Sequence, residues 1–285
     1  MQSPLPFLSD AHLFGLPWLL VGELLLLGIC AGFLAGLLGV GGGMFLAPFM
    51  TAILSYRGVP AEMAVKMAIA TCMATILFTS ASSVRAHHRH GAVQWRLVAT
   101  LAPGIVVGGL LAGAGAFSLL KGAVLALVFA GFLVLNATQM LLGRRQAQAR
   151  PMPGPGGQTL AGVVIGFVAG LVGAGGGFVS VPFMTGHGVT IHKAIATSAA
   201  LGFPIALAAV AGYVISGWSM QAPLPGAGGY VFVPALVLIA CASIVLAPVG
   251  ARLAQGLPVK LLRQLYALLL LALATYMLFK GIQSI

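Results

Sequence analysis

Two clusters of closely spaced glycines form the pattern in this sequence that is best suited to a binding site. They are Gly39, Gly41, Gly42 and Gly43, and Gly173, Gly175, Gly176 and Gly177. Consecutive glycines lower the cost of leaving a helix, so we expect each cluster to end one helix and begin a short new one. The first amides of a helix are unpaired and carry partial positive charge, which suits a small oxyanion. The alternative is that these glycines only let helices pack closely.

Two prolines follow the glycine clusters at the same distance. Pro48 and Pro182 lie five residues after Gly43 and Gly177. Proline is tolerated in the first turn of a helix and kinks it further in. We therefore expect both prolines to shape the short helices after the breaks, without contacting a ligand.

Hydroxyl side chains recur downstream of both clusters. Thr71 in the first half matches Thr197 in the second, where Ser198 follows; the first half has Cys72 at that place. A hydroxyl can donate to an anion without the desolvation cost of a charge, so we expect Thr71, Thr197 and Ser198 to contribute to the site. Thr75 and Thr79 are expected to bond back to the helix carbonyls four residues earlier.

Four charged residues have alternative interpretations that the sequence leaves open. Lys66 and Lys193 could attract an anion to the mouth of a pathway, or they could anchor helix ends by reaching toward water. Glu23 and Glu62 are the acids outside the N-terminal tail. An acid within a membrane segment is costly and is a candidate for carrying a coupling proton, although Glu23 lies near the start of its apolar run.

The composition places these residues in a membrane protein. Of the 285 residues, 60% are hydrophobic and 6% are charged, and the mean hydropathy is +1.09. A soluble domain carries about a quarter charged residues. The positive charges are scattered in short loops, which argues against nucleic-acid binding. His87, His88 and His90 lack converging carboxylates or thiols, so we expect no metal site. No catalytic constellation and no cofactor motif are recognisable, so we expect no enzyme.

Ten apolar runs define the expected elements of an all-α polytopic fold. They cover residues 18–38, 44–54, 64–84, 97–117, 122–142, 160–174, 178–184, 194–215, 230–254 and 264–279. Most approach the roughly 20 residues that a membrane-spanning helix needs, but 44–54 and 178–184 are too short. We expect an N-terminal tail (1–17), a first transmembrane repeat (18–142), a basic linker rich in Pro and Gly (143–158) and a second repeat (159–285).

The two repeats share sequence. GFLAGLLGVGGGMFLAPFM at 32–50 returns as GFVAGLVGAGGGFVSVPFM at 166–184, and VKMAIATC at 65–72 matches IHKAIATS at 191–198. Two matches in the same order indicate internal duplication. Such repeats, interrupted at corresponding places, mark the binding site of many transporters.

The distribution of charge favours inverted repeats over parallel ones. If each glycine cluster is the tip of a hairpin, the halves are inverted and ten of the 14 Lys and Arg share one side. Positive residues concentrate in the cytoplasm, which then holds residues 85–96 and 143–158 and leaves both termini outside. If only the long runs cross, the charges divide seven and seven and give no orientation.

The doubled G-x-x-G-x-G-G-G…P motif, each copy followed by an A-x-A-T-S-type stretch, resembles the sulfite exporter TauE/SafE family of bacterial membrane permeases. The resemblance extends from Gly28 over nearly the whole chain. It implies secondary transport of small sulfur-containing anions such as sulfite or organosulfonates, outward across the inner membrane and coupled to a proton or another ion. An anion channel that uses the same site is the alternative.

Overall fold

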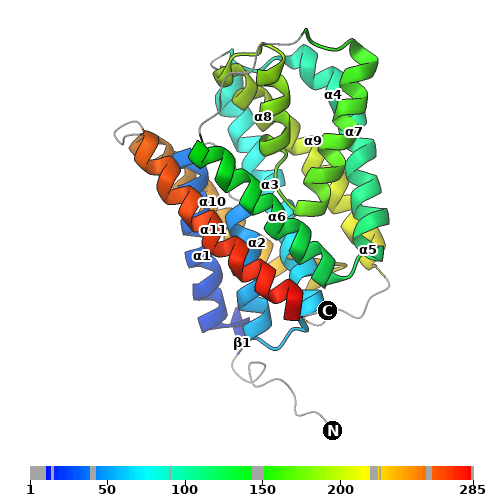
Figure 1. Ribbon diagram of the computed structural model, residues 1–285. Helices are drawn as coiled ribbons and strands as arrows, with labels where there is room; N and C mark the ends of the chain where they lie inside the picture. Colours follow the sequence, from blue (N-terminus) through cyan, green and yellow to red (C-terminus); the bar gives the residue numbers. More distant parts are fainter. Residues whose placement is uncertain are drawn as a thin grey trace.

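The computed structural model describes residues 11–13, 16–38, 43–89, 91–142, 151–218, 224, 226–254 and 259–283. In chain order the elements are β1 (Ala11–Leu13), β2 (Leu16–Pro17), α1 (Trp18–Leu38), α2 (Gly43–Tyr56), α3 (Ala61–Arg89), α4 (Trp95–Leu110), the π-helical segment η2 (Leu111–Ala116), α5 (Phe117–Leu119), α6 (Gly122–Leu142), α7 (Pro155–Val172), α8 (Gly177–Gly186), α9 (Ile191–Gly217), β3 (Ala227–Gly228), β4 (Val231–Phe232), α10 (Val233–Ala254) and α11 (Val259–Gln283). The molecule is a helical bundle with two small antiparallel strand pairs (Figure 1).

The apolar runs predict these helices closely. The bounds of α1 and α6 coincide with the runs 18–38 and 122–142, and the two short runs become the short helices α2 and α8. The linker prediction (143–158) is too long at its end, because α7 begins at Pro155. Proline suits the first position of a helix, where no amide hydrogen is needed. Residues 143–150 lie outside the described part of the chain.

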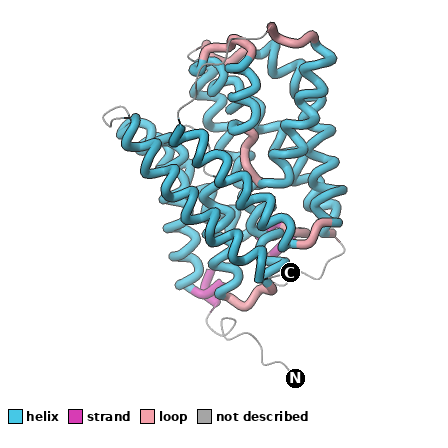
Figure 2. Tube along the Cα trace, viewed as in Figure 1, coloured by secondary structure: helices cyan, strands magenta, loops and turns pink. Residues whose placement is uncertain are grey.

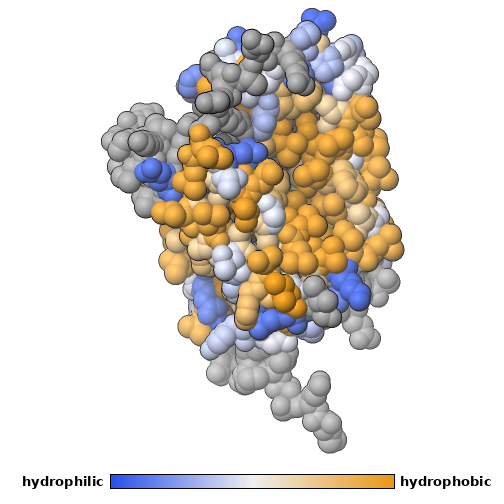
Figure 3. Space-filling model, in the orientation of Figure 1, coloured by the Kyte–Doolittle hydropathy of each residue, from blue (hydrophilic) through white to orange (hydrophobic). Residues whose placement is uncertain are grey.

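Six helical segments in the described residues are long and apolar enough to cross a membrane. They are 61–85, 95–119, 122–142, 155–172, 191–217 and 266–283. Figure 3 shows apolar side chains over the middle of the visible face, with hydrophilic ones gathered toward both ends. The chain is therefore an all-α, multi-pass membrane protein, as its composition predicts.

Close contacts between glycines and neighbouring backbones join the two halves of the chain. Helix α1 packs against α10, and α7 packs against α4. A Cβ placed on Gly32 would lie 2.5 Å from the carbonyl oxygen of Ser243, and one on Gly166 would clash with that of Ile105. Only glycine permits such an approach without displacing backbone. Gly32 and Gly166 therefore serve close helix packing, as small residues often do between membrane helices.

The remaining long helices pack as two further pairs. Helices α3 and α9 contact each other in the interior, where α3 is largely buried, and α6 packs along α11. Figure 1 shows α6 and α11 running diagonally side by side across the front of the bundle. Helices from both halves thus form the interior of the bundle.

Candidate functional site

The second glycine break forms a short loop between α7 and α8. Gly173 ends α7 in the left-handed conformation (φ 68°), and its amide donates to the carbonyl of Ala169 at 2.9 Å. Gly176 is also left-handed (φ 72°) and accepts at its carbonyl from the amides of Val179 and Ser180 at the start of α8. Glycine adopts these angles without the steric cost that other residues pay. Figure 2 shows this loop, in pink, within the layer of helices and not at either end.

Gly43, the last glycine of the first cluster, lies against the second break. Gly39, Gly41 and Gly42 lie outside the described residues, but Gly43 is buried at the first position of α2. A Cβ placed on Gly43 would lie 3.0 Å from the carbonyl oxygen of Gly173. The N-terminus of one short helix therefore meets the end of the helix that precedes the other.

Isoleucine side chains pack onto both breaks. The same Cβ on Gly43 would lie 2.8 Å from Cδ1 of Ile76, and one on Gly175 would lie 3.3 Å from Cγ2 of Ile76. Ile76 of α3 thus contacts both breaks at once. Ile205 of α9 lies closer still to Gly176. In this conformation the helix termini are covered by apolar side chains.

The hydroxyl oxygens of Thr71 and Thr197 make equivalent contacts with backbone amides. The buried hydroxyl of Thr71 accepts from the amide of Phe232 at 3.0 Å, and that of Thr197 accepts from the amide of Gln94 at 3.0 Å. Their contact with substrate stays a prediction. The hydroxyl of Thr75 bonds back to the carbonyl of Thr71, which confirms the back-bonding expected there.

A buried serine pair lies beside the second break. The hydroxyl of Ser180 in α8 donates to that of Ser198 in α9 at 2.8 Å, and the amide of Ser180 donates to the carbonyl of Gly176 at 2.8 Å. Ser198 was expected in the site, whereas Ser180 was missed. The signal lay in the repeat alignment, because Leu46 and Cys72 stand where the second half has these two serines. Both positions of the pair are polar in only one half.

Lys66 and Lys193 differ in their surroundings. Lys66 is buried, with its Nζ 3.7 Å from the Glu62 carboxylate and 5.7 Å from the centroid of the Tyr230 ring. Burial, and then the charge of Glu62, raise the pKa of the Tyr230 hydroxyl. Lys193 is exposed in the first turn of α9. Of the two lysines, Lys66 is the one that lies close to a break, one turn before Ile69, whose side chain packs on Gly173.

The two acids that were candidates for proton coupling each have a cationic partner. Glu62 pairs with Lys66, four residues later in the same helix. Glu23 accepts from Nη2 of Arg57 at 3.0 Å, across 34 residues of chain. This second pair joins α1 to the turn between α2 and α3.

The two prolines lie inside the short helices, beyond the first turn. Pro48 is buried in α2 and Pro182 is half-buried in α8. Each lacks the amide hydrogen that would otherwise donate to a carbonyl four residues earlier. Their effect on the shape of the breaks stays a prediction.

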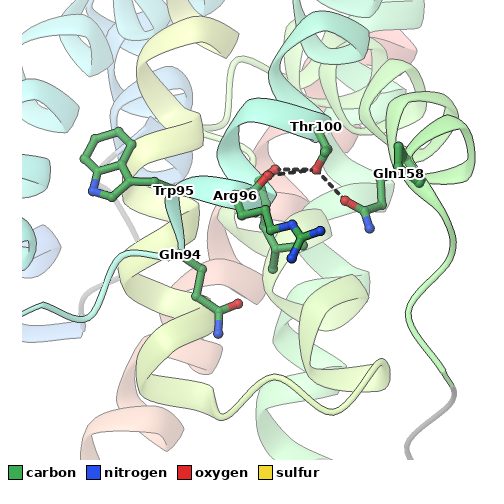
Figure 4. A pocket seen from close by; sticks show the side chains of 7 residues that line it. Gln94, Trp95, Arg96, Thr100 and Gln158 are labelled. Atoms are coloured by element: carbon green, nitrogen blue, oxygen red, sulfur yellow. Dashed lines mark hydrogen bonds between the residues drawn. The ribbon is translucent and has the colours of Figure 1, made fainter.

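A cavity of about 510 Å³ opens where the N-termini of α4 and α7 meet. It is lined by Gln94, Trp95, Arg96, Leu97, Thr100, Pro155 and Gln158 (Figure 4). The hydroxyl of Thr100 donates to the side-chain oxygen of Gln158, whose amide nitrogen donates to the carbonyl of Pro153 at 2.8 Å. The backbone amide of Gln94, one of the residues that line the cavity, also donates to the hydroxyl of Thr197, which precedes Ser198 in α9.

Comparison with known proteins identifies the family. The sulfite exporter TauE/SafE family matches residues 24–277. A probable membrane transporter protein of Haemophilus influenzae is 33% identical over 257 residues, covering 90% of this chain and 97% of that protein. Another, from Methanocaldococcus jannaschii, is 27% identical over 267 residues, covering 91% and 96%. No solved structure matches the chain. With its helical membrane fold and its doubled glycine break, the chain belongs to the sulfite exporter TauE/SafE family.

Proposed function

We propose that this protein is a secondary transporter that exports small sulfur-containing anions, such as sulfite or organosulfonates. The anion binds where the two glycine breaks face each other, on the first amides of α2 and α8. The single observation that carries this proposal is the approach of Gly43 to Gly173, which brings two helix interruptions from distant parts of the chain into contact. Irregular backbone at membrane depth is tolerated where it is enclosed in protein or lines a cavity.

The transport mechanism that we propose is alternating access between two inverted repeats. Three pairs of contacts between the halves support the duplication. In each pair, a residue of the first half contacts the second half, and the matching residue of the second half contacts the first. The contact of Gly28 with Ile239 corresponds to that of Gly162 with Leu101, and the contact of Gly32 with Ser243 corresponds to that of Gly166 with Ile105. The hydrogen bond of Thr71 with Phe232 corresponds to that of Thr197 with Gln94. Such reciprocal contacts are what a duplicated unit produces when the copies exchange packing partners.

The arrangement of the hairpins supports the inverted orientation. The loop that joins α2 to α3 lies at the opposite end of the bundle from the loop that joins α8 to α9 (Figure 2). We place the latter end in the cytoplasm and both termini outside the inner membrane, because basic residues concentrate on the cytoplasmic side. Arg85, Arg96 and Lys193 then face the cytoplasm, and Arg57, Lys66, Lys121 and Lys280 lie toward the outside.

Substrate must displace the side chains that cover the breaks. Ile76 lies against Gly43 and Gly175, and Ile205 lies against Gly176. Rocking of one repeat against the other would withdraw these side chains and expose the helix termini to one side at a time. The buried serine pair and the cavity at Gln94 lie on the proposed cytoplasmic side, which gives an anion polar contacts on its way to the second break.

Counterflow in proteoliposomes tests the proposal. Vesicles holding the purified protein are preloaded with unlabelled sulfite, thiosulfate or sulfoacetate, and uptake of the labelled anion is followed. A carrier shows faster uptake after preloading, because the loaded site returns across the membrane. Uptake that is unaffected by preloading and grows linearly with concentration indicates the anion channel instead. Stimulation by cations or neutral solutes alone would contradict an anion site.

A further inference from the structure

The ion pair between Glu23 and Arg57 leaves donors unused. Nη2 of Arg57 donates to Oε2 of Glu23 at 3.0 Å, and the Arg57 side chain is only 9% exposed. The buried Nε of Arg57 and the buried hydroxyl of Ser55, two residues earlier, have no hydrogen-bond partner among the described residues. A guanidinium offers Nε and one terminal nitrogen as a parallel fork for two oxygens. Buried donors without partners are rare in proteins and call for an explanation, such as a missing ligand or water.

We propose that Glu23 and Arg57 form a proton-linked subsite for an oxyanion, in which the anion replaces the ionised carboxylate. This inference rests on the proposed function and names where the transported anion and a proton bind the protein together. With Glu23 ionised, its carboxylate neutralises Arg57 and closes the subsite. When Glu23 takes up a proton, Arg57 remains as a buried cation, and the transported anion neutralises it in place of the carboxylate. One proton is therefore bound for each anion that enters.

The geometry of Arg57 favours an oxyanion as the occupant. Its fork is rigid and planar, so two oxygens of a sulfonate, sulfite or sulfate group can accept from Nη2 and Nε together. The carboxylate of Glu23 engages only one of these donors in the structure. The Ser55 hydroxyl supplies a further unused donor in the same turn of chain.

Glu23 is the acid that couples the anion to a proton at this position. It is the charged residue of α1, and its carboxylate, 33% exposed, can reach water to take up a proton. Glu62 is 55% exposed and pairs with Lys66 instead. Helix α1 itself and the elements packed against it, which are α2, α10, β1 and β2, hold these other titratable or charged residues: His12, Cys30, Tyr56, Cys241 and Arg252.

This coupling has a consequence for the driving force. A monovalent anion that moves together with one proton carries no net charge across the membrane. The membrane potential then exerts no force on the loaded protein, since that force is proportional to the charge moved. Transport follows the combined gradients of anion and proton, so export requires an outward gradient of the anion that exceeds any inward gradient of protons.

Proton uptake on anion binding tests the subsite. The purified full chain in detergent is titrated with sulfite, thiosulfate and sulfoacetate by calorimetry, in buffers of different ionisation heat, from which the number of protons bound follows. In the wild type the affinity falls about tenfold per pH unit wherever free Glu23 is ionised, because binding takes up one proton. In Glu23→Gln the proton uptake disappears and the affinity at high pH rises. Protons that the anion itself takes up or releases are the same for the wild type and the variant, so they cancel when the two are compared with the same anion.

Two further variants control the experiment. Arg85→Gln removes an exposed arginine at the far end of α3 and should leave proton uptake unchanged. The double variant Glu23→Gln with Arg57→Gln removes both charges together, so no unpaired buried charge hinders folding. It should not show the high affinity for the anion that we expect of Glu23→Gln alone. Unchanged proton uptake in Glu23→Gln, or loss of uptake in Glu62→Gln instead, would overturn the inference while the proposed function stands. If the wild type binds none of the three anions, the proposed function is wrong as well.

Discussion

Thr71 and Thr197 each accept a hydrogen bond from the backbone of the opposite half. Thr71 of α3 bonds to the amide of Phe232, just before α10, and Thr197 of α9 bonds to that of Gln94, just before α4. The two threonines occupy the same position of the shared A-I-A-T stretch. Each hydroxyl therefore ties one central helix to the residue just before the long helix that follows the other central helix.

Removing either hydroxyl should destabilise the protein by a similar amount. Thr71→Val and Thr197→Val leave a backbone amide without its acceptor, at a cost of about 1–3 kcal/mol when the amide is buried. Thermal unfolding in detergent measures the effect, with Thr71→Ser and Thr197→Ser as controls that keep the hydroxyl. If one valine variant is as stable as the wild type, the two contacts are not equivalent.

Adding a methyl group at the contact between the breaks should impair transport. In Gly43→Ala the new Cβ lies 3.0 Å from the carbonyl oxygen of Gly173, so the breaks must separate. Overpacking of this kind costs about 1–3 kcal/mol. If it raises the free energy of the conformation that transport requires by that amount, the transport rate drops about 5- to 150-fold. Counterflow measures the rate. Gly131→Ala in α6, where nothing lies within 4 Å of the new methyl, is the matched control. Equal rates for both variants would show that contact between the breaks is unimportant for transport.

The left-handed glycine at the start of α8 should tolerate no side chain. Gly176→Ala forces an alanine to φ 72° and brings its Cβ into steric clash with Cδ1 of Ile205. The backbone conformation alone costs about 1–2 kcal/mol for a residue with a Cβ. Gly176→Ala together with Ile205→Val removes the contact but keeps the strained backbone. We expect partial recovery of the melting temperature in the double variant, and full recovery would show that strain is negligible.

The serine pair should act as a unit on the anion. In Ser180→Ala and Ser198→Ala we expect affinity to fall about 10- to 100-fold, the worth of a hydrogen bond to a charged group. Because the hydroxyls bond to each other, the double variant should lose less than the sum of the two single losses in free energy. Calorimetric titration with the anion found by counterflow measures all three variants. Strict additivity would indicate that the serines act independently.

The orientation of the bundle predicts which loops a membrane-impermeant thiol reagent reaches. In a chain whose Cys30, Cys72 and Cys241 are replaced by alanine, Lys121→Cys should react in intact cells. His192→Cys should react only after the inner membrane is permeabilised. Both positions are exposed in the structure. The reverse pattern would place the cytoplasmic side at the other end of the bundle.

The sequence predicts the helices well because their lengths and glycines have local causes. The run 122–142 matches α6 without correction, and the left-handed turns at Gly173 and Gly176 occur where clustered glycines lower the cost of such angles. Contacts between distant residues were not predictable in the same way. Glu23 meets Arg57 across 34 residues, and Gln94 meets Thr197 across 103, with no periodicity that relates either pair. Ser180 could have been found by comparing the two repeats position by position.

The exchange of packing partners between the halves constrains how the chain is synthesised. Helix α1 ends at Leu38, whereas α10, on which its Gly28 and Gly32 pack, begins only at Val233. At ordinary translation speeds the ribosome needs about 10–40 s to produce the intervening chain. During that time the nascent α1 waits in the bilayer or translocon without its partner. Helix α4, by contrast, is complete before α7 emerges, so the second hairpin inserts against a surface that is already in place.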